Sequence, residues 1–312
     1  MIGAIARGSM RRPRHITLIF HRIMAAHDPM SPSEPDSAWF DRLIGYLARR
    51  FDIIPVREAL ARAEARTLDG RSLSITFDDG YADNFTQALP VLERHGAPAT
   101  FFVASGYIDG GRMWNDSIIE TVRRLPQGKT EVEGFEEGPL ELDGWDSRHA
   151  AASRLIAAWK HLAPTERQRR VDLLAARVAG LPDDLMMTRE QLRGLASSDC
   201  AEIGGHTRSH PILAAIDDTS AVAEIEGGKR DLEEWLQHEV KLFAYPNGKR
   251  GRDYSAEHAR LARAAGFEAA LATDWGTLDA HTDPFAIPRF TPWQRSLDRF
   301  AADLARCHHG LL

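Results

Sequence analysis

The sequence has little cysteine, no strong charge excess and no long hydrophobic run. Its 312 residues include two cysteines, Cys200 and Cys307, so neither a disulfide framework nor a cysteine-based zinc module is expected. The formal net charge of −6 gives no extended positive field, which makes nucleic acid a poor partner. Nowhere do 18 apolar residues run together, and no apolar segment follows the basic N-terminus. We therefore expect a cytoplasmic protein without a membrane span.

Short apolar runs alternate with segments of helical periodicity along most of the chain. We predict strands at residues 16–20, 51–56, 72–77, 99–103, 201–204, 241–244, 268–272 and 285–290, with amphipathic helices between most of them. This alternation predicts an α/β fold with a parallel sheet, and roughly eight such pairs predict closure into a barrel. With 43% hydrophobic residues, the chain can bury the core of such a barrel over residues 14–306.

The alternation is interrupted between residues 107 and 185. Residues 129–144 are acidic and rich in turn formers, and their alternation of polar and apolar residues predicts a small hairpin. Two helices are predicted after it, at 147–160 and 164–179. We therefore predict that residues 107–185 form a mainly helical insertion within the barrel.

Polar side chains that suit chemistry follow the predicted strands. They are His21, Asp78, Asp79, His206, Tyr245, Asp274 and Arg289. Each lies at or just beyond the C-terminal end of a strand, and in barrel enzymes these ends form the face on which active sites assemble. We therefore expect these residues to gather on one face.

Two adjacent carboxylates are the first indication of chemistry. Asp78 and Asp79 end the apolar run 72–77 and precede Gly80, which permits a sharp turn. Neighbouring carboxylates in a partly buried place repel each other unless a cation or a hydrogen-bond donor divides their roles. A metal site is therefore expected here.

Two imidazoles four residues apart, His206 and His210, are the second indication. A catalytic zinc-type ion takes three protein ligands and leaves a position for water, and two His with one Asp suit it. Asp79 is the expected third ligand. The helical zinc-protease motif needs Glu after its first His, but Thr207 stands there, so that motif is disfavoured. Alone, the His pair fits ordinary polar loop residues better; joined to the Asp pair, it predicts a metal centre.

Three motifs carry a resemblance to a known family. They are Thr-Phe-Asp-Asp-Gly at 76–80, Ala-Thr-Phe-Phe-Val at 99–103 and His-Thr-Arg-Ser-His-Pro at 206–211. Together they resemble the polysaccharide deacetylase family, also called carbohydrate esterase family four, over most of the chain. The resemblance implies an irregular, distorted β/α barrel of roughly seven or eight strands. It also implies metal-dependent hydrolysis of an N-acetyl group, usually on N-acetylglucosamine units.

The resemblance implies roles residue by residue. Asp78 corresponds to the general base of the family. Asp79, His206 and His210 correspond to the ligands of a divalent metal ion, for which zinc is expected first, with cobalt or nickel as alternatives. A carbohydrate substrate is the implied partner.

Two departures from the family pattern concern the remaining site residues. The Arg-Pro-Pro-Tyr motif of many members is represented only by Tyr245 and Pro246. We hypothesise that Arg289 supplies the guanidinium that orients the base, and that the backbone N–H of Tyr245 holds the oxyanion. The C-terminal Leu-x-His motif is absent, whereas Leu18-Ile-Phe-His21 resembles it at the opposite end, as in the circularly permuted branch that includes exopolysaccharide deacetylases. The resemblance then implies His21 as the general acid.

Several residues keep two interpretations. Asn115 or Asp116 suits a helix cap, whereas Trp114 beside them could stack on a sugar ring. Asp274 and Trp275 could support the site or line a sugar subsite, or they could be ordinary loop residues.

Two other functions remain open on this fold. One is hydrolysis of cyclic amides such as imides or allantoin, and the other is a non-catalytic barrel that binds carbohydrate. Relatives that act on cyclic amides often lose metal ligands, whereas this chain keeps all three. The intact base and ligands likewise argue against a non-catalytic barrel.

Overall fold

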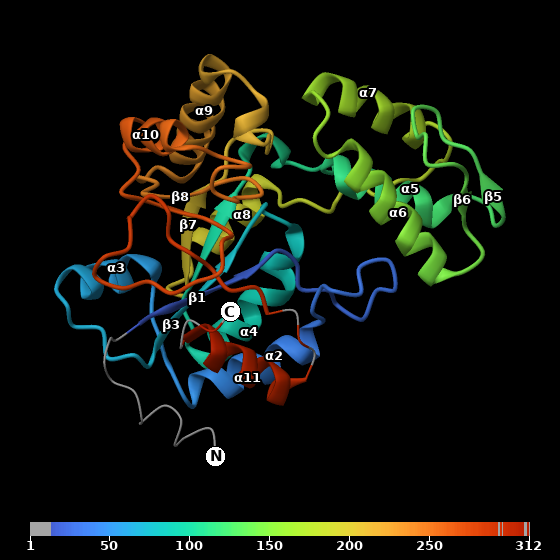
Figure 1. Ribbon diagram of the computed structural model, residues 1–312. Coiled ribbons are helices and arrows are strands. Elements are labelled where there is room, and N and C mark those ends of the chain that lie inside the picture. Colours follow the sequence, from blue (N-terminus) through green and yellow to red (C-terminus); the bar gives the residue numbers. More distant parts are fainter. Residues whose placement is uncertain (1–13, 293, 295, 309–310, 312) are drawn as a thin grey trace.

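A curled parallel sheet forms the centre of the molecule. The computed structural model describes residues 14–292, 294, 296–308 and 311 (Figure 1). The strands are β1 (Ile16–Phe20), β2 (Asp52–Ile53), β3 (Ser72–Phe77), β4 (Ala99–Val103), β7 (Ala201–Gly205), β8 (Leu242–Ala244) and β9 (Ala269–Leu271). Their order is β1-β3-β4-β7-β8-β9, with β2 also paired to β3, and every pair is parallel. The predicted α/β fold, an irregular barrel, is confirmed.

The last predicted strand, 285–290, closes the sheet without forming a regular strand. Within it, Ile287 bridges to Leu271 of β9 and Phe290 bridges to Leu18 of β1, both in parallel orientation. The two open edges of the sheet are therefore joined by isolated bridges instead of a full hydrogen-bonded ladder. The barrel is irregular because its closing segment is short.

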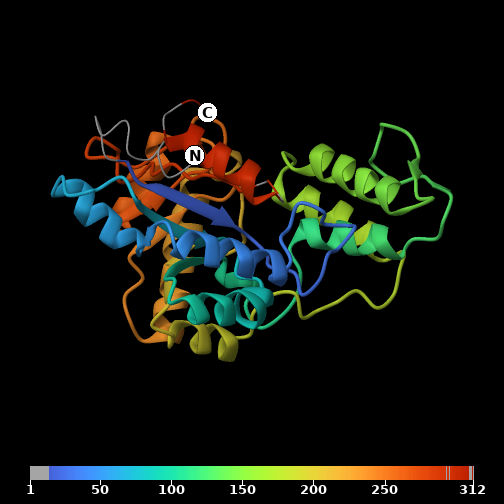
Figure 2. The same ribbon diagram turned by 90° about the horizontal axis from the view of Figure 1, so that it is seen from below.

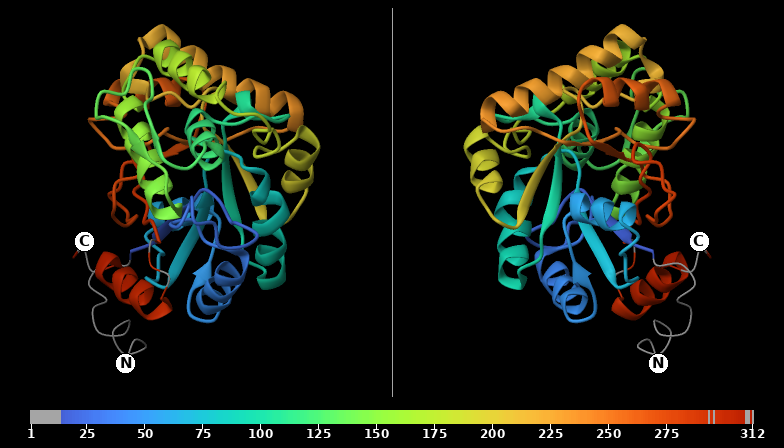
Figure 3. Two further views of the ribbon diagram at one scale, coloured as in Figure 1. Left: turned by 90° about the vertical axis from the view of Figure 1, so that its right-hand side faces the viewer. Right: turned by 90° about the vertical axis from the view of Figure 1, so that its left-hand side faces the viewer.

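Helices surround this sheet (Figure 3). They are α2 (Ser37–Ala48), α3 (Val56–Glu64), α4 (Leu89–His95), α8 (Arg189–Ala196), α9 (Asp218–Leu236), α10 (Ala256–Ala264) and α11 (Leu297–His308). The predicted capping box at the start of α8 is confirmed, because the side chains of Thr188 and Gln191 each accept a hydrogen bond from the other's backbone N–H. Among the described residues, no helix combines the length and hydrophobicity that crossing a bilayer requires.

Strands β1, β3 and β4 are buried along their whole length, which explains why they read as unbroken apolar or small-residue runs. The rings of Phe20, Phe77 and Phe101, one from each strand, stack on one another with centroid distances of 5.5 and 4.8 Å. Phe40 of α2 meets two of these rings edge-on, which fastens the helix to the sheet.

The segment 107–185 contributes a helical lobe beside the barrel (Figures 1 and 2). It holds α5 (Trp114–Arg124), β5 (Lys129–Thr130), β6 (Leu140–Glu141), α6 (Trp145–Trp159) and α7 (Pro164–Ala175). The predicted hairpin is confirmed as the antiparallel pair β5–β6. The lobe has its own apolar core, to which Met30 of the loop after β1 also belongs.

Candidate active site

Asp79, His206 and His210 converge at the C-terminal ends of β3 and β7. The Nε2 atoms of His206 and His210 lie 3.4 and 3.3 Å from Oδ1 of Asp79, and one ligand atom from each residue lies within 4.8 Å of the others. The backbone turns sharply to bring this about, since Asp79 has a φ of 80° and Gly80 a φ of 93°. A positive φ is unfavourable for an aspartate. The conformation of Asp79 therefore lowers the stability of the folded state, but it directs the carboxylate towards the two histidines.

The three residues fit a divalent metal ion. Oδ1 of Asp79 is buried and has no hydrogen-bond partner among the described residues, which suits an oxygen whose partner is a cation. Nδ1 of His206 is hydrogen-bonded to the carbonyl of Ala244 at 2.7 Å, which fixes the ring with Nε2 directed at the site. Two imidazoles and one carboxylate are the ligand set of a catalytic zinc-type ion.

The protonation of the site suits ligation. Burial alone would raise the pKa of Asp79, but His210 and His206 outweigh it and hold the pKa below its ordinary range. Burial lowers the pKa of His210 to about 4, so this imidazole is neutral and offers a lone pair. At His206 the charges of Asp78 and Asp79 overcome burial and raise the pKa.

Arg289 holds Asp78 in place, in agreement with the hypothesis that Arg289 supplies the guanidinium missing from the motif. Nη1 and Nη2 of Arg289 donate to the two carboxylate oxygens of Asp78, each at 2.7 Å, and both side chains are buried. Nε of Arg289 donates to the carbonyl of Ala272 at 2.8 Å. Burial would raise the pKa of Asp78, but Arg289 and then His206 outweigh it and lower the pKa. Asp78 is therefore an ionised, rigidly oriented carboxylate beside the metal ligands.

His21 lies close to this group, at the end of β1. Its backbone carbonyl accepts a hydrogen bond from Nδ2 of Asn84 at 2.9 Å. The charge of His21 lowers the pKa of Asp78 after the larger effects of burial, Arg289 and His206, and it lowers the pKa of Asp79 after the larger effects of burial, His210 and a hydrogen bond with His206. His21 is therefore near both aspartates, and its role as a general acid stays a prediction.

The predicted oxyanion role of Tyr245 does not fit the structure. Its backbone N–H donates to the carbonyl of Leu271 at 3.1 Å, and its hydroxyl donates to the carbonyl of Phe285 at 3.0 Å. Its ring stacks on Tyr254 with a centroid distance of 3.7 Å. Tyr245 is a fully buried structural residue, and a motif match could not show that the sheet uses its N–H.

The same loop contains a backbone N–H without a partner among the described residues, which the sequence did not indicate. Pro246 has no N–H, and the N–H of Gly248 donates to the carbonyl of Pro246 at 2.7 Å. The N–H of Asn247 donates to no group among the described residues. Asn247 has a φ of 60°, a backbone conformation that Asn adopts more readily than most residues. An Asn between Pro246 and Gly248 is therefore the sequence signal for this turn.

Comparison with known proteins agrees with this geometry. Residues 65–270 match the family model described as polysaccharide deacetylase. The chain belongs to the polysaccharide deacetylase family. YxkH of Bacillus subtilis, whose name assigns it to the same family, is 29% identical over 92 residues. This match spans about a third of each protein, 30% of this chain and 32% of YxkH.

Solved structures of deacetylases share the fold. IcaB from Ammonifex degensii is 18% identical with a TM-score of 0.60, and the match covers 95% of this chain and 97% of IcaB. The Streptococcus pyogenes deacetylase PplD, solved in complex with acetate, is 15% identical with a TM-score of 0.59, covering 90% of this chain and 92% of PplD. At these identities the likeness establishes the polysaccharide deacetylase fold, while the roles of individual residues rest on the geometry above.

The structure also places residues for which the sequence left two interpretations. Oδ2 of Asp116 accepts a hydrogen bond from the N–H of Met113 at 3.2 Å, so the cap interpretation is confirmed. Trp114 is buried in the lobe's core, with the guanidinium of Arg167 over its ring. The carbonyl of Asp274 accepts a hydrogen bond from the N–H of Arg289 at 2.9 Å, so Asp274 supports the residue that holds Asp78.

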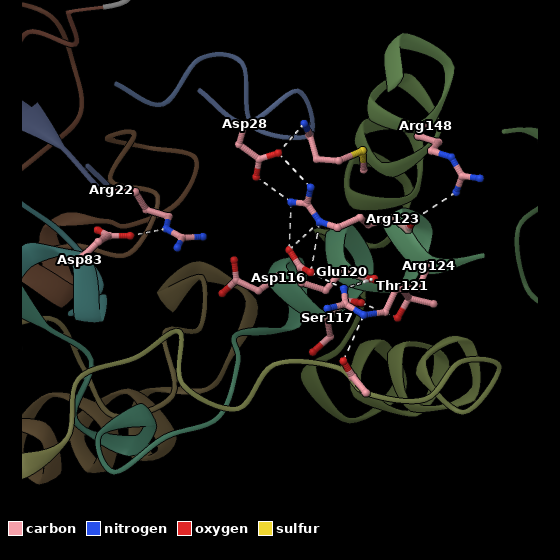
Figure 4. A network of polar contacts seen from close by, with 12 residues as sticks. Arg22, Asp28, Asp83, Asp116, Ser117, Glu120, Thr121, Arg123, Arg124 and Arg148 are labelled. Carbon is pink, nitrogen blue, oxygen red and sulfur yellow. Dashed lines mark hydrogen bonds and ion pairs between the residues drawn. The ribbon is translucent and has the colours of Figure 1, made fainter. Parts of the chain in front are cut away.

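Sequence reasoning also missed a polar cluster that joins the site to the lobe. The hydroxyl of Tyr81 lies 3.2 and 3.1 Å from the two oxygens of Asp116, and the guanidinium of Arg22 lies 4.7 Å from the centroid of the Tyr81 ring. Nε of Arg22 donates to Asp83 at 2.8 Å (Figure 4). Burial raises the pKa of Asp116 to about 7. Nothing in the sequence near Asp116 indicated a partner 35 residues away.

Proposed function

We propose that this polysaccharide deacetylase is a metal-dependent hydrolase that removes N-acetyl groups from an amino-sugar glycan or glycan precursor of the N-acetylglucosamine type. One observation carries the proposal. The ligand set Asp79, His206 and His210 converges beside a second carboxylate, Asp78, whose two oxygens are fixed by Arg289. One carboxylate is thus committed to a cation and the other to proton transfer.

Each residue has a distinct task in this hydrolysis. A divalent ion held by Asp79, His206 and His210 would polarise the acetamide carbonyl and lower the pKa of a water molecule. Asp78, kept ionised by Arg289, takes a proton from the attacking water. His21 gives a proton to the leaving nitrogen, because an amine does not leave as an anion. Backbone N–H groups stabilise charge that develops on the carbonyl oxygen, and the N–H of Asn247 is a candidate for this.

Acetate release from an acetylated chito-oligosaccharide tests the proposal. We expect release by the purified protein, its loss after chelation, and its recovery with zinc, cobalt or nickel. His206→Ala should prevent added metal from restoring acetate release, because it removes one of the proposed metal ligands. His21→Ala should lower the rate by about 10²–10⁴-fold and remove the alkaline limb of the pH profile, which is the limb that a general acid produces.

Three outcomes would count against the proposal. Deacetylation that persists undiminished in the chelated protein contradicts the metal site. Turnover of a cyclic imide or allantoin without acetate release would place the chain among the cyclic amidases. Sugar binding with no turnover under any metal would indicate a non-catalytic barrel.

A further inference from the structure

Two arginines are buried among the described residues, and they differ in their partners. Arg289, with no exposed surface, meets the carboxylate of Asp78. Arg167, on the first turn of α7 and 7% exposed, has no Asp or Glu within 4.0 Å, although every acidic side chain of the chain lies among the described residues. Arginine is rarely buried without an anion, because the desolvation of its charge must be offset.

The contacts of Arg167 orient its guanidinium without neutralising it. Nη1 donates to the carbonyl of Lys160 at 3.3 Å, and the guanidinium carbon lies 4.8 Å from the centroid of the Trp114 ring. Nε is buried with no hydrogen-bond partner among the described residues. Nη2 likewise donates to no described group, but it is not among the atoms shut off from solvent. The edge of the planar guanidinium formed by Nε and Nη2 is therefore available to donate hydrogen bonds to a ligand.

Arg167 is connected to the candidate ligands through the first turn of α5. Burial raises the pKa of Tyr107 to about 12, and the next charges that act on it are those of Arg167 and Asp79. The hydroxyl of Tyr107 donates to the carbonyl of Ser209, the residue before the ligand His210, at 3.2 Å. The guanidinium also lies over Trp114 at the start of α5, and Asp116 in the first turn of the same helix contacts the hydroxyl of Tyr81, two residues after Asp79. Arg167 is therefore joined through one helical turn to the segment that carries a candidate ligand.

A second unpaired cation lies at the same boundary between lobe and barrel. Lys160, directly after α6, also has no Asp or Glu within 4.0 Å among the described residues. Burial lowers its pKa, and the charges that act on it next are Asp253 and Arg252 of the barrel loop after β8. Asp253 is already paired with Arg252 at 3.0 Å. Neither Arg167 nor Lys160 is therefore paired directly with a carboxylate among the described residues.

We propose that Arg167 binds an anionic oxygen group of the substrate, a phosphate or a carboxylate, beside the sugar whose acetyl group is removed. The inference rests on the proposed deacetylase function and narrows its substrate class to an anionic glycan. A guanidinium presents parallel N–H donors that match both phosphate and carboxylate oxygens. Trp114 keeps its plane in place, which reduces the entropy lost on binding.

Calorimetric binding to the full-length, metal-loaded protein tests the inference. The probes are N-acetylglucosamine, its 1-phosphate, and an uncharged and a glucuronate-containing disaccharide of N-acetylglucosamine. We expect one or both anionic probes to bind about tenfold or more tightly than their neutral counterparts, since a charged hydrogen bond is worth more than 1.4 kcal/mol. The phosphate and glucuronate arms show which oxygen group is recognised.

Variants locate the effect at Arg167. Arg167→Gln should abolish the preference for the anionic probe and leave the affinity for the neutral probe unchanged. Arg167→Lys, which keeps the charge but loses the planar fork, should retain part of the preference and covers the case in which the Gln variant does not fold. Arg177→Gln is the matched control: it removes an exposed lobe arginine that donates only to a carbonyl, and it should change nothing.

The results separate this inference from the proposed function. Equal affinities for anionic and neutral probes in the wild type, or a preference that survives Arg167→Gln, would overturn the anionic site even if acetate is released. A preference that depends on Arg167 without acetate release from any probe would support the anionic site and contradict the deacetylase proposal.

Discussion

The barrel and the lobe treat a buried arginine in different ways. In the barrel, Arg289 is matched by the carboxylate of Asp78 and by a carbonyl, so its charge is balanced within the chain. In the lobe, Arg167 meets an indole and a carbonyl but no carboxylate among the described residues. The difference shows in which region the charge of a buried arginine is paired with a carboxylate of the chain and in which region it is not. The barrel holds a complete ion pair, and the lobe holds a guanidinium that, in our proposal, a ligand balances.

The largest effect expected from this comparison is on stability. Arg289→Met leaves Asp78 buried without a partner, and breaking such a pair costs about 3–5 kcal/mol. Arg167→Met leaves no carboxylate unpaired and loses mainly the contact with the Trp114 ring, so its cost should be about 1 kcal/mol or less. Urea unfolding of the two variants at pH 7 measures both. Similar losses of unfolding free energy would show that Arg167 has an anionic partner within the chain.

A smaller effect is expected where the two regions meet, at Asp116. Its pKa in the folded protein, about 7, is above its ordinary value, so the folded state binds the proton more tightly than the unfolded state. The stability that this proton contributes is fully present below about pH 4 and is lost as the pH rises towards 7, by at most about 1.4 kcal/mol per pH unit.

The neutral variant Asp116→Asn isolates this contribution. Urea unfolding at pH 5 and pH 8 should show a larger loss of stability for the wild type than for the variant. If both proteins lose the same amount, the carboxyl of Asp116 does not titrate between the barrel and the lobe as described.

The smallest effect is expected at the ion pair that ties the lobe to the loop carrying His21. Nη1 and Nη2 of Arg123 on α5 donate to the carboxylate of Asp28 at 2.9 and 2.6 Å (Figure 4). Because the pair is partly exposed, Arg123→Gln should cost about 1 kcal/mol. Hydrogen exchange should become faster in residues 21–36. Arg154→Gln, which breaks an exposed pair inside the lobe, is the control and should leave that loop unchanged.

The sequence allowed the barrel, and the meeting of the three candidate ligands, to be predicted because local patterns specify both. Strand β3 was predicted with its observed bounds, since a buried parallel strand reads as a continuous run that ends at a turn. Asp79, His206 and His210 were brought together by a general rule, that the C-terminal ends of barrel strands share one face.

The remaining features depend on contacts that no local pattern contains. The sheet hydrogen bond of Tyr245 depends on its register with Leu271, which the motif does not encode. Arg167 reads as one of several charged residues on an amphipathic helix, and only packing against Trp114 shows that it is buried. Asp116 was read as a cap, and its second partner, Tyr81, belongs to the barrel.

The closing segment of the barrel has a consequence for how the protein is made. Arg289 lies 211 residues after Asp78, on the same short segment that joins the two sheet edges. During synthesis Asp79, His206 and His210 leave the ribosome long before this guanidinium does. A nascent chain that stops short of residue 285 carries all three of these candidate ligands but leaves Asp78 without its partner, so the pair formed by Asp78 and Arg289 is completed last.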